Sequence, residues 1–480
     1  MAHEFGELKR KVVSGAFLAG GAQVARQLLQ LGAVALLARW LGPRPYGVLA
    51  MAVSVLGLAQ IFADLGLGSA AARDRAIEPA RDATLFRLSL LAAAATYLVV
   101  EVAAPWIAGL FAEPAMTAVL RAVAPGFLLV GALQTRRAAL LRELRFRATA
   151  AIELFAVAAG IAASVAAAAS GLRVGALVLG SLVQQVAWCA AVLLLAGVPP
   201  AAPFRLAAVR ADLRYGLPLT GFNLVNYFAR TLDNMLVGGL MGAIALGLYE
   251  KAYALMMLPV TQIAAAFAQV LHPALSSVRE ERDRLAFLYL GAVRKMAGLA
   301  FPAAALCIAA AGPVVRLLLG PRFEGAVPIF ATLSLVMAIQ PIFASAGWLY
   351  MATGRTGRMF LWGTVNAAVL CGCIVAGALR GRPLDVARAY AIGSAALFLP
   401  TLFVATRTAG IRLRDVLARI AAPAVAAAAA AFAGTRLPSG SFAATVAVVG
   451  VVYVGVHLAL DRRALFDLLR FLDPRRAFHA

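Results

Sequence analysis

Long runs of apolar residues, separated by short polar segments, dominate the pattern of this 480-residue chain. A helix that spans a membrane needs about 20 predominantly apolar residues, and runs of this kind recur along the whole sequence. They predict fourteen spanning helices, at residues 12–38, 47–68, 84–104, 116–135, 149–170, 174–197, 215–241, 248–272, 288–315, 325–352, 359–379, 385–406, 417–434 and 441–460. No segment between them is long enough for a separate soluble domain. The pattern therefore predicts an all-α, multi-pass membrane protein.

The basic residues of the polar segments predict the orientation of these helices. The N-terminal segment, the even-numbered loops and the C-terminal segment hold 28 of the 44 Lys and Arg residues, whereas the odd-numbered loops hold 9. Short loops rich in Lys and Arg stay on the cytoplasmic side of a membrane. Both termini are therefore expected to be cytoplasmic, which requires an even number of spans.

Composition and net charge exclude several functional classes. Hydrophobic residues make up 63% of the chain and charged residues 14%, and the formal net charge is +22. A chain this apolar cannot cover the surface of a soluble nucleic-acid-binding protein, so no nucleic-acid partner is expected. The four cysteines and four histidines are scattered, and no phosphate-binding loop or catalytic motif is present. We therefore expect no metal site, no cofactor, no catalytic residues and no enzymatic activity.

The two halves of the chain resemble each other at an offset near 200 residues. Leu41-Gly42, followed by Gly47 after four residues, recurs as Met241-Gly242 and Gly247. Further along, Pro105 matches Pro313 and Gln134 matches Gln340. Each copy holds six predicted helices, an even number, so the two copies share one orientation. The expected fold is two parallel six-helix bundles around a central cavity, with two additional C-terminal helices. The corresponding domains are the bundles 1–200 and 201–410, the helix pair 411–460 and a cytoplasmic tail 461–480.

Polar residues interrupt the first predicted helix of each copy. In the first copy Gln23, Arg26 and Gln30 are spaced by three and four residues, which places them on one helix face. In the second copy Asn223, Asn226 and Arg230 have the same spacing at an offset of 200. An ionisable residue at mid-membrane costs about 2.5–3.5 kcal/mol on insertion scales, so such residues usually face a cavity or a partner.

These stripes favour a cavity whose wall is cationic. Two guanidinium groups, those of Arg26 and Arg230, are able to clamp a diphosphate through paired donors. The alternative is structural: Arg230 pairs with Asp233 on the same helix, and Arg26 bonds to helix carbonyls. Three acidic residues, Asp233, Glu101 and Glu153, are candidates for ion coupling or gating. Glu101 and Glu153 alternatively pair with Arg121 or Arg87.

Several segments carry a resemblance to a known family. They include Ala-Arg-Trp-Leu-Gly-Pro-Arg-Pro-Tyr-Gly (38–47), Phe-Ala-Asp-Leu-Gly-Leu-Gly-Ser-Ala (62–70), Leu-Gly-Leu-Tyr-Glu-Lys-Ala-Tyr-Ala-Leu-Met-Met-Leu-Pro-Val (246–260) and His-Pro-Ala-Leu-Ser (272–276). With these motifs the chain resembles the polysaccharide-transport branch of the multidrug/oligosaccharidyl-lipid/polysaccharide exporter superfamily. The resemblance extends over about residues 12–410.

The resemblance implies a flippase of the bacterial cytoplasmic (inner) membrane. Members of this branch translocate undecaprenyl-diphosphate-linked oligosaccharide repeat units to the periplasmic leaflet by alternating access, for O-antigen, capsule or exopolysaccharide export. The implied partners are the lipid-linked oligosaccharide, membrane lipids, H⁺ or Na⁺ as a coupling ion, and the polysaccharide polymerase and export machinery. Two alternatives remain open. A drug or cation antiporter of the same superfamily favours an acidic cavity, and a membrane glycosyltransferase or polymerase requires a large periplasmic loop or a metal-binding carboxylate motif.

Overall fold

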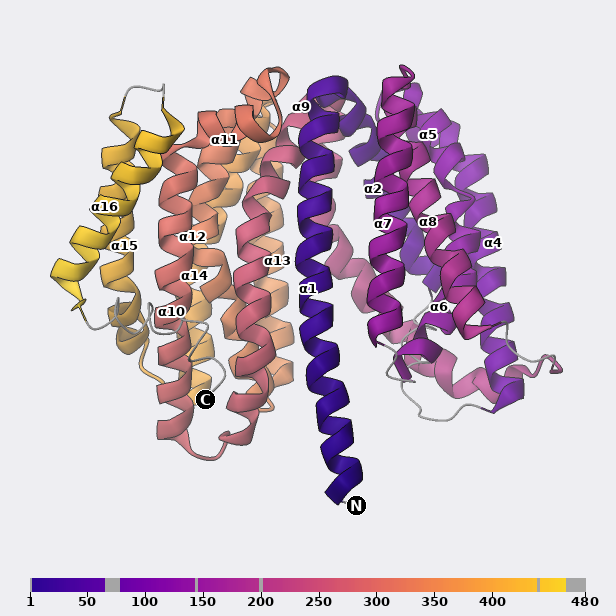
Figure 1. Ribbon diagram of the computed structural model, residues 1–480, viewed down its shortest axis with the longest axis horizontal. Helices are drawn as coiled ribbons and strands as arrows, with labels where there is room; N and C mark the ends of the chain where they lie inside the picture. Colours follow the sequence, from indigo (N-terminus) through magenta and orange to yellow (C-terminus); the bar gives the residue numbers. More distant parts are fainter. Residues whose placement is uncertain (1, 65–77, 143–145, 198–201, 438–440, 463–480) are drawn as a thin grey trace. The chain divides into compact units, whose positions relative to one another are not determined.

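The computed structural model describes residues 2–64, 78–142, 146–197, 202–437 and 441–462 (Figure 1). Within these ranges the secondary structure is helical and contains no strand. The tail from residue 463 onward, residues 65–70 of the 62–70 motif and Arg145 of the second basic loop lie outside the described residues. The chain divides into two compact units, Met1–Gly247 and Leu248–Ala480. The division at residues 200, 410 and 460 that the repeat suggests stays a prediction.

The first unit consists of helices of very different lengths. They are α1 (Ala2–Leu41), α2 (Pro43–Asp64), α4 (Pro79–Leu110), α5 (Ala115–Val123), α6 (Gly126–Arg142), α7 (Phe146–Ala169), α8 (Val174–Ala196), the 3₁₀ helix η1 (Leu206–Val209) and the first part of α9 (Arg210–Ser277). Helix α7 packs against α1 and α8, and α6 packs against α4 and α8. Leu140, Ile152 and Val192 form part of a small core between α6, α7 and α8.

The second unit begins within α9 and ends at the C-terminal helices. It contains α10 (Arg282–Ala309), α11 (Ala311–Leu318), η2 (Pro321–Ala326), α12 (Val327–Ala352), α13 (Thr356–Ala378), α14 (Pro383–Ala409), α15 (Leu413–Thr435) and α16 (Phe442–Leu460). Its main core joins the end of α9 with α10, α12, α14 and the start of α15. A smaller cluster, with Ala305, Ala426 and Tyr453, packs the pair α15–α16 on α10.

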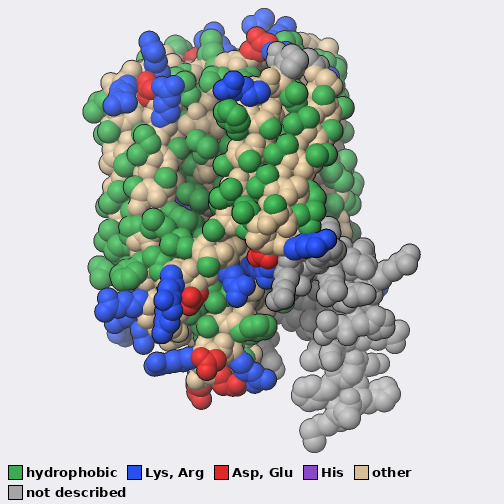
Figure 2. Space-filling model, turned by 90° about the vertical axis from the view of Figure 1, so that its left-hand side faces the viewer, with side chains coloured by type: hydrophobic (Ala, Val, Ile, Leu, Met, Phe, Trp, Pro, Cys, Tyr) green, Lys and Arg blue, Asp and Glu red, His purple; other side chains and the backbone are tan. Residues whose placement is uncertain are grey.

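Twelve helical segments of the described residues are long and apolar enough to cross a membrane. One of them, Asn223–Ser277 in α9, contains the predicted span 248–272 and most of the predicted span 215–241, and the predicted first span lies in α1. On the face of the second unit that carries α15 and α16, apolar side chains fill the middle and charged ones gather toward both ends (Figure 2). Because hydrocarbon tolerates apolar side chains and excludes charges, this distribution is typical of a transmembrane surface. The prediction of an all-α, multi-pass membrane protein is confirmed.

The repeated glycines occupy equivalent places in the fold. Gly42 ends α1 with φ +75°, and Gly242 breaks α9 with φ +83°. Positive φ favours glycine because a Cβ atom is strained there. Five residues later, a Cβ on Gly47 would lie 1.7 Å from the Ala243 carbonyl oxygen, and one on Gly247 would lie 2.0 Å from that of Pro43. The two copies of the motif therefore cross each other reciprocally, with backbone against backbone.

Candidate functional site

A polar cavity of about 270 Å³ lies in the first unit between α2, α6 and α9. Its lining residues are Gln60, Ile61, Asp64, Gln134, Asn223, Asn226, Tyr227 and Arg230. All of them except Ile61 carry polar side chains. Polar residues in spanning helices are costly unless they face a cavity, water or a partner, so this cluster is the first candidate for a binding site.

Helix α9 supplies three of the residues that the sequence singled out. Asn223, Asn226 and Arg230 follow one another at spacings of three and four, and all three line the cavity. Such spacing stacks side chains on one face of a helix. The structure thus brings the polar stripe of the second copy to one wall of a single cavity.

A tyrosine between these residues fixes the wall against α2. The Tyr227 hydroxyl donates to the carbonyl oxygens of Ser54 at 2.8 Å and Val53 at 3.3 Å. A Cβ on Gly57 would lie 2.3 Å from that hydroxyl, so the ring fits only because residue 57 has no side chain. Because α2 and α9 approach closely here, this wall of the cavity has little room to move.

The facing walls contain residues that sequence reasoning did not assign to the site. Gln60 and Asp64 come from the end of α2, and Gln134 comes from α6. The sequence does mark these three residues in the same way as those of α9, because each is a polar residue within an apolar run. Periodicity within one helix could not reveal them, because the three walls meet only in the folded unit.

The described lining of this cavity includes one cation and one anion. Among those described residues, Arg230 is the only guanidinium and Asp64 is the only carboxylate. Among the described residues no ion pair joins Arg230 to Asp233, although they are three residues apart. The buried Asp233 carboxylate accepts a hydrogen bond from the backbone N–H of Asn234 at 2.8 Å. Arg230 is solvent-exposed within the cavity mouth and therefore remains accessible to an anionic ligand.

The other predicted arginine belongs to a different cluster. Arg26 of α1 donates to Gln23 and forms an ion pair with Glu153 of α7, at 3.5 Å. The same carboxylate lies 3.7 Å from Arg137 of α6, whose guanidinium stacks over the Trp188 ring at 5.3 Å. Glu153 is thus held between two arginines. Neither Arg26 nor Gln23 lines the α2–α6–α9 cavity.

The remaining predicted residues also have assigned places. Gln30 is exposed on α1 and does not line the cavity. Glu101 of α4 pairs with Arg121 of α5 at 3.3 Å, which is one of the two alternatives that the sequence left open for it. The side chains of Arg121 and Glu101 are 50% and 34% exposed, so the contact contributes little to stability.

The cavity offers a mixed set of hydrogen-bonding groups. Four side-chain amides, from Gln60, Gln134, Asn223 and Asn226, both donate and accept. The guanidinium of Arg230 supplies a fork of donors that matches phosphate oxygens, and the Asp64 carboxylate accepts from hydroxyl groups. This combination suits a ligand that carries both a phosphate and sugar hydroxyls.

Comparisons with known proteins match one family model and several relatives of this chain. The family model described as "Polysaccharide biosynthesis protein" matches residues 36–328. The chain is 24% identical to the lipopolysaccharide biosynthesis protein WzxC of Escherichia coli K12, over 77% of this chain and 76% of that one. It is 22% identical to the succinoglycan biosynthesis transport protein ExoT of Rhizobium meliloti, over 94% of both chains.

A solved structure shows the same fold at low sequence identity. The lipid II flippase MurJ, in an inward closed conformation, superposes with a TM-score of 0.78 at 15% identity, covering 94% of this chain and 100% of that chain. At this identity the likeness concerns the arrangement of helices alone.

Proposed function

This chain belongs to the family of polysaccharide biosynthesis proteins, and on that premise we propose that it flips undecaprenyl-diphosphate-linked oligosaccharide repeat units across the bacterial cytoplasmic membrane. The headgroup moves from the cytoplasmic to the periplasmic leaflet by alternating access, and the product serves exopolysaccharide, capsule or O-antigen export. Both termini lie in the cytoplasm, as the distribution of Lys and Arg over the loops suggests. No covalent bond is made or broken in this process.

The single observation that carries the proposal is the polar α2–α6–α9 cavity with its accessible Arg230. Its amides and carboxylate suit sugar hydroxyls, and its guanidinium suits a phosphate oxygen. WzxC is a lipopolysaccharide biosynthesis protein and ExoT is a succinoglycan biosynthesis transport protein, which supports a glycan as cargo. The polyprenyl tail stays in the lipid phase throughout, because its transfer to water is unfavourable.

The role of Arg26 follows from its ion pair. In this structure Glu153 neutralises Arg26, so a diphosphate would bind Arg26 only by displacing that carboxylate. We propose that Arg26, with Gln23 and Gln30, contacts the diphosphate at a second point of the transport cycle, in addition to Arg230. Glu153 is then the natural candidate for coupling, since protonation of its carboxylate by H⁺ releases Arg26. Glu101, Asp233 and the alternative ion Na⁺ stay candidates of the same proposal.

The experiment measures flipping of a labelled lipid-diphosphate oligosaccharide in proteoliposomes. Arg230→Gln is expected to reduce the initial rate by about 10- to 100-fold, since a charge-assisted bond to phosphate is worth about 1.5–3 kcal/mol. Arg173→Gln, an exposed arginine that precedes α8, is the matched control and should flip at the wild-type rate. Arg230→Lys keeps the positive charge but loses the forked N–H donors of the guanidinium, and it should retain part of the flipping activity.

Two results contradict parts of this proposal in different ways. If Arg230→Gln flips the substrate as fast as wild type, the cavity is not where the diphosphate binds. If wild type flips no diphosphate-linked glycan but exports a cationic dye, the protein is an antiporter of the same superfamily. Imposed H⁺ and Na⁺ gradients in the same vesicles identify the coupling ion.

A further inference from the structure

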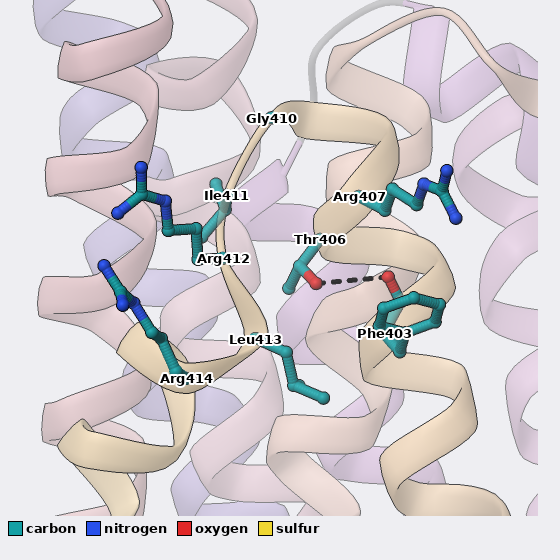
Figure 3. Close-up of a pocket in the computed structure, with 8 residues that line it drawn as sticks. All are labelled: Phe403, Thr406, Arg407, Gly410, Ile411, Arg412, Leu413 and Arg414. Carbon is teal, nitrogen blue, oxygen red and sulfur yellow. Dashed lines mark hydrogen bonds between the residues drawn. The ribbon is translucent and has the colours of Figure 1, made fainter.

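A second cavity, of about 720 Å³, lies in the second unit at the turn that joins α14 to α15 (Figure 3). Its lining residues are Phe403, Thr406, Arg407, Gly410, Ile411, Arg412, Leu413 and Arg414. Three of these eight residues are arginines, and none is acidic. This concentration of positive charge is separate from the polar cavity of the first unit in both sequence and composition.

Hydrogen bonds and a buried side chain hold the backbone of the turn between α14 and α15. Gly410 adopts φ +76° and ends α14, which only glycine does without strain. The Ile411 amide donates to the Thr406 carbonyl at 2.9 Å, and the Ile411 side chain is buried in the main core of the unit. The Thr406 hydroxyl bonds back to the Leu402 and Phe403 carbonyls. The backbone that precedes residues 412–414 is therefore held in one conformation, which orients these residues.

The arginine side chains divide between two sides of this turn. Figure 3 shows Arg412 and Arg414 pointing to the same side, whereas Arg407 points to the other. Arg407 lies 5.9 Å from the Phe403 ring centroid, over its face. Arg414 has an exposed contact of 3.6 Å with Asp415, and Arg412 forms no ion pair with any described residue. The Arg412–Arg414 side of the turn thus presents two guanidinium groups, of which only that of Arg414 contacts a carboxylate.

More positive charge comes from the start of α10. A Cβ on Gly410 would contact the Arg282 side chain at 3.7 Å, so that arginine lies beside the turn. Like charges held close together are unfavourable unless an anion lies between them. A phosphate group carries the required charge and acceptor oxygens.

Apolar residues flank the cationic turn on the spanning part of both helices. Leu399 and Phe403 of α14 and Leu417 of α15 are exposed large hydrophobic side chains. Guanidinium groups directly beside such a surface lie at the boundary between hydrocarbon and water. We propose that the Arg412–Arg414 side of this cavity binds the phosphate headgroup of an anionic phospholipid, whose acyl chains cover the adjacent apolar surface of α14 and α15.

The test uses the full-length protein in detergent and native mass spectrometry with added lipids. Wild type is expected to bind phosphatidylglycerol about tenfold more tightly than phosphatidylcholine of the same acyl chains, because the phosphatidylglycerol headgroup is a net anion, whereas the choline ammonium offsets the phosphate charge and is repelled by the arginines. The double variant Arg412→Gln/Arg414→Gln should lose this preference. The control Arg279→Gln/Arg284→Gln removes the same charge near the start of α10, from arginines paired with Glu280 and Glu281, and should keep it.

Each other outcome rejects the inference. Equal loss of preference in both double variants means that overall charge, and not this turn, attracts the lipid. Soluble glycerol phosphate binding as tightly as phosphatidylglycerol means that the apolar flank contributes nothing and the ligand is a free phosphate. Displacement of phosphatidylglycerol by far lower concentrations of undecaprenyl diphosphate means that the turn belongs to the transported substrate. Melting temperatures without lipid show that all variants are folded.

Discussion

The reciprocal glycine crossing gives a prediction whose magnitude follows from the structure. Alanine at position 47 places a methyl group 1.7 Å from the Ala243 carbonyl oxygen, whereas ordinary contacts of a Cβ atom begin near 3.4 Å. Neither atom belongs to a flexible side chain, so the two helices must separate by well over 1 Å. Overpacking of this kind costs about 1–3 kcal/mol, and loss of the close backbone approach adds to it.

A control variant separates this effect from helix propensity. Glycine to alanine in a helix otherwise stabilises by about 0.5–1 kcal/mol. Gly239→Ala in α9 tests that baseline, because its Cβ would meet only a Phe111 ring atom at 4.0 Å. Gly47→Ala should therefore lower the melting temperature in detergent, while Gly239→Ala should leave it unchanged or raise it.

The reciprocal site makes the test sharper. Gly247→Ala should destabilise as Gly47→Ala does, since its Cβ would lie 2.0 Å from the Pro43 carbonyl oxygen. The double variant should lose less than the sum of the two, because helices that have already separated accommodate the second methyl group. Thermal unfolding followed by intrinsic fluorescence compares the four variants with wild type. Equal melting temperatures for Gly47→Ala and Gly239→Ala would refute the crossing.

Two further predictions concern contacts of the first unit. Arg81 donates two hydrogen bonds, of 2.8 and 2.6 Å, to the buried Asp212 carboxylate, so Arg81→Met should lower the free energy of unfolding by about 3–5 kcal/mol. Arg87→Met, at an exposed arginine of the same helix, should leave it unchanged. Chemical unfolding compares the two variants, and equal stability would contradict the buried pair. Tyr227→Phe removes the bond to the Ser54 carbonyl and should cost about 1 kcal/mol with a lower flipping rate in proteoliposomes, whereas an unchanged melting temperature would mean that the hydroxyl does not fix the cavity wall.

Part of the candidate site could be predicted from sequence because it depends on one helix. Asn223, Asn226 and Arg230 share a cavity wall because their spacing alone determines a common face. The same argument on α1 placed Gln23 and Arg26 together, and the two are in hydrogen-bonding contact. The spacing within one helix could not predict which residues of other helices contact these faces.

The other walls of the cavity depend on which helices pack together. Gln60 and Gln134 lie 74 residues apart in the chain, and neither stands in a periodic pattern with α9. Glu153 likewise meets Arg26 across 127 residues, and Arg137 joins them from a third helix. Several partners of opposite charge were available to each group, and periodicity could not choose among them.

By itself, the sequence determined the elements of this protein and their repetition. The length of the apolar runs specifies spanning helices, since the bilayer thickness and the helix rise are fixed. The recurring glycines specify where the chain turns, since positive φ and backbone contact exclude side chains at Gly42 and Gly242, and at Gly47 and Gly247. Only the tertiary structure decided which polar groups neutralise one another and which stay accessible. It left Arg230 open to a ligand and paired Arg26 with Glu153, because ion pairs depend on distances that no local pattern encodes.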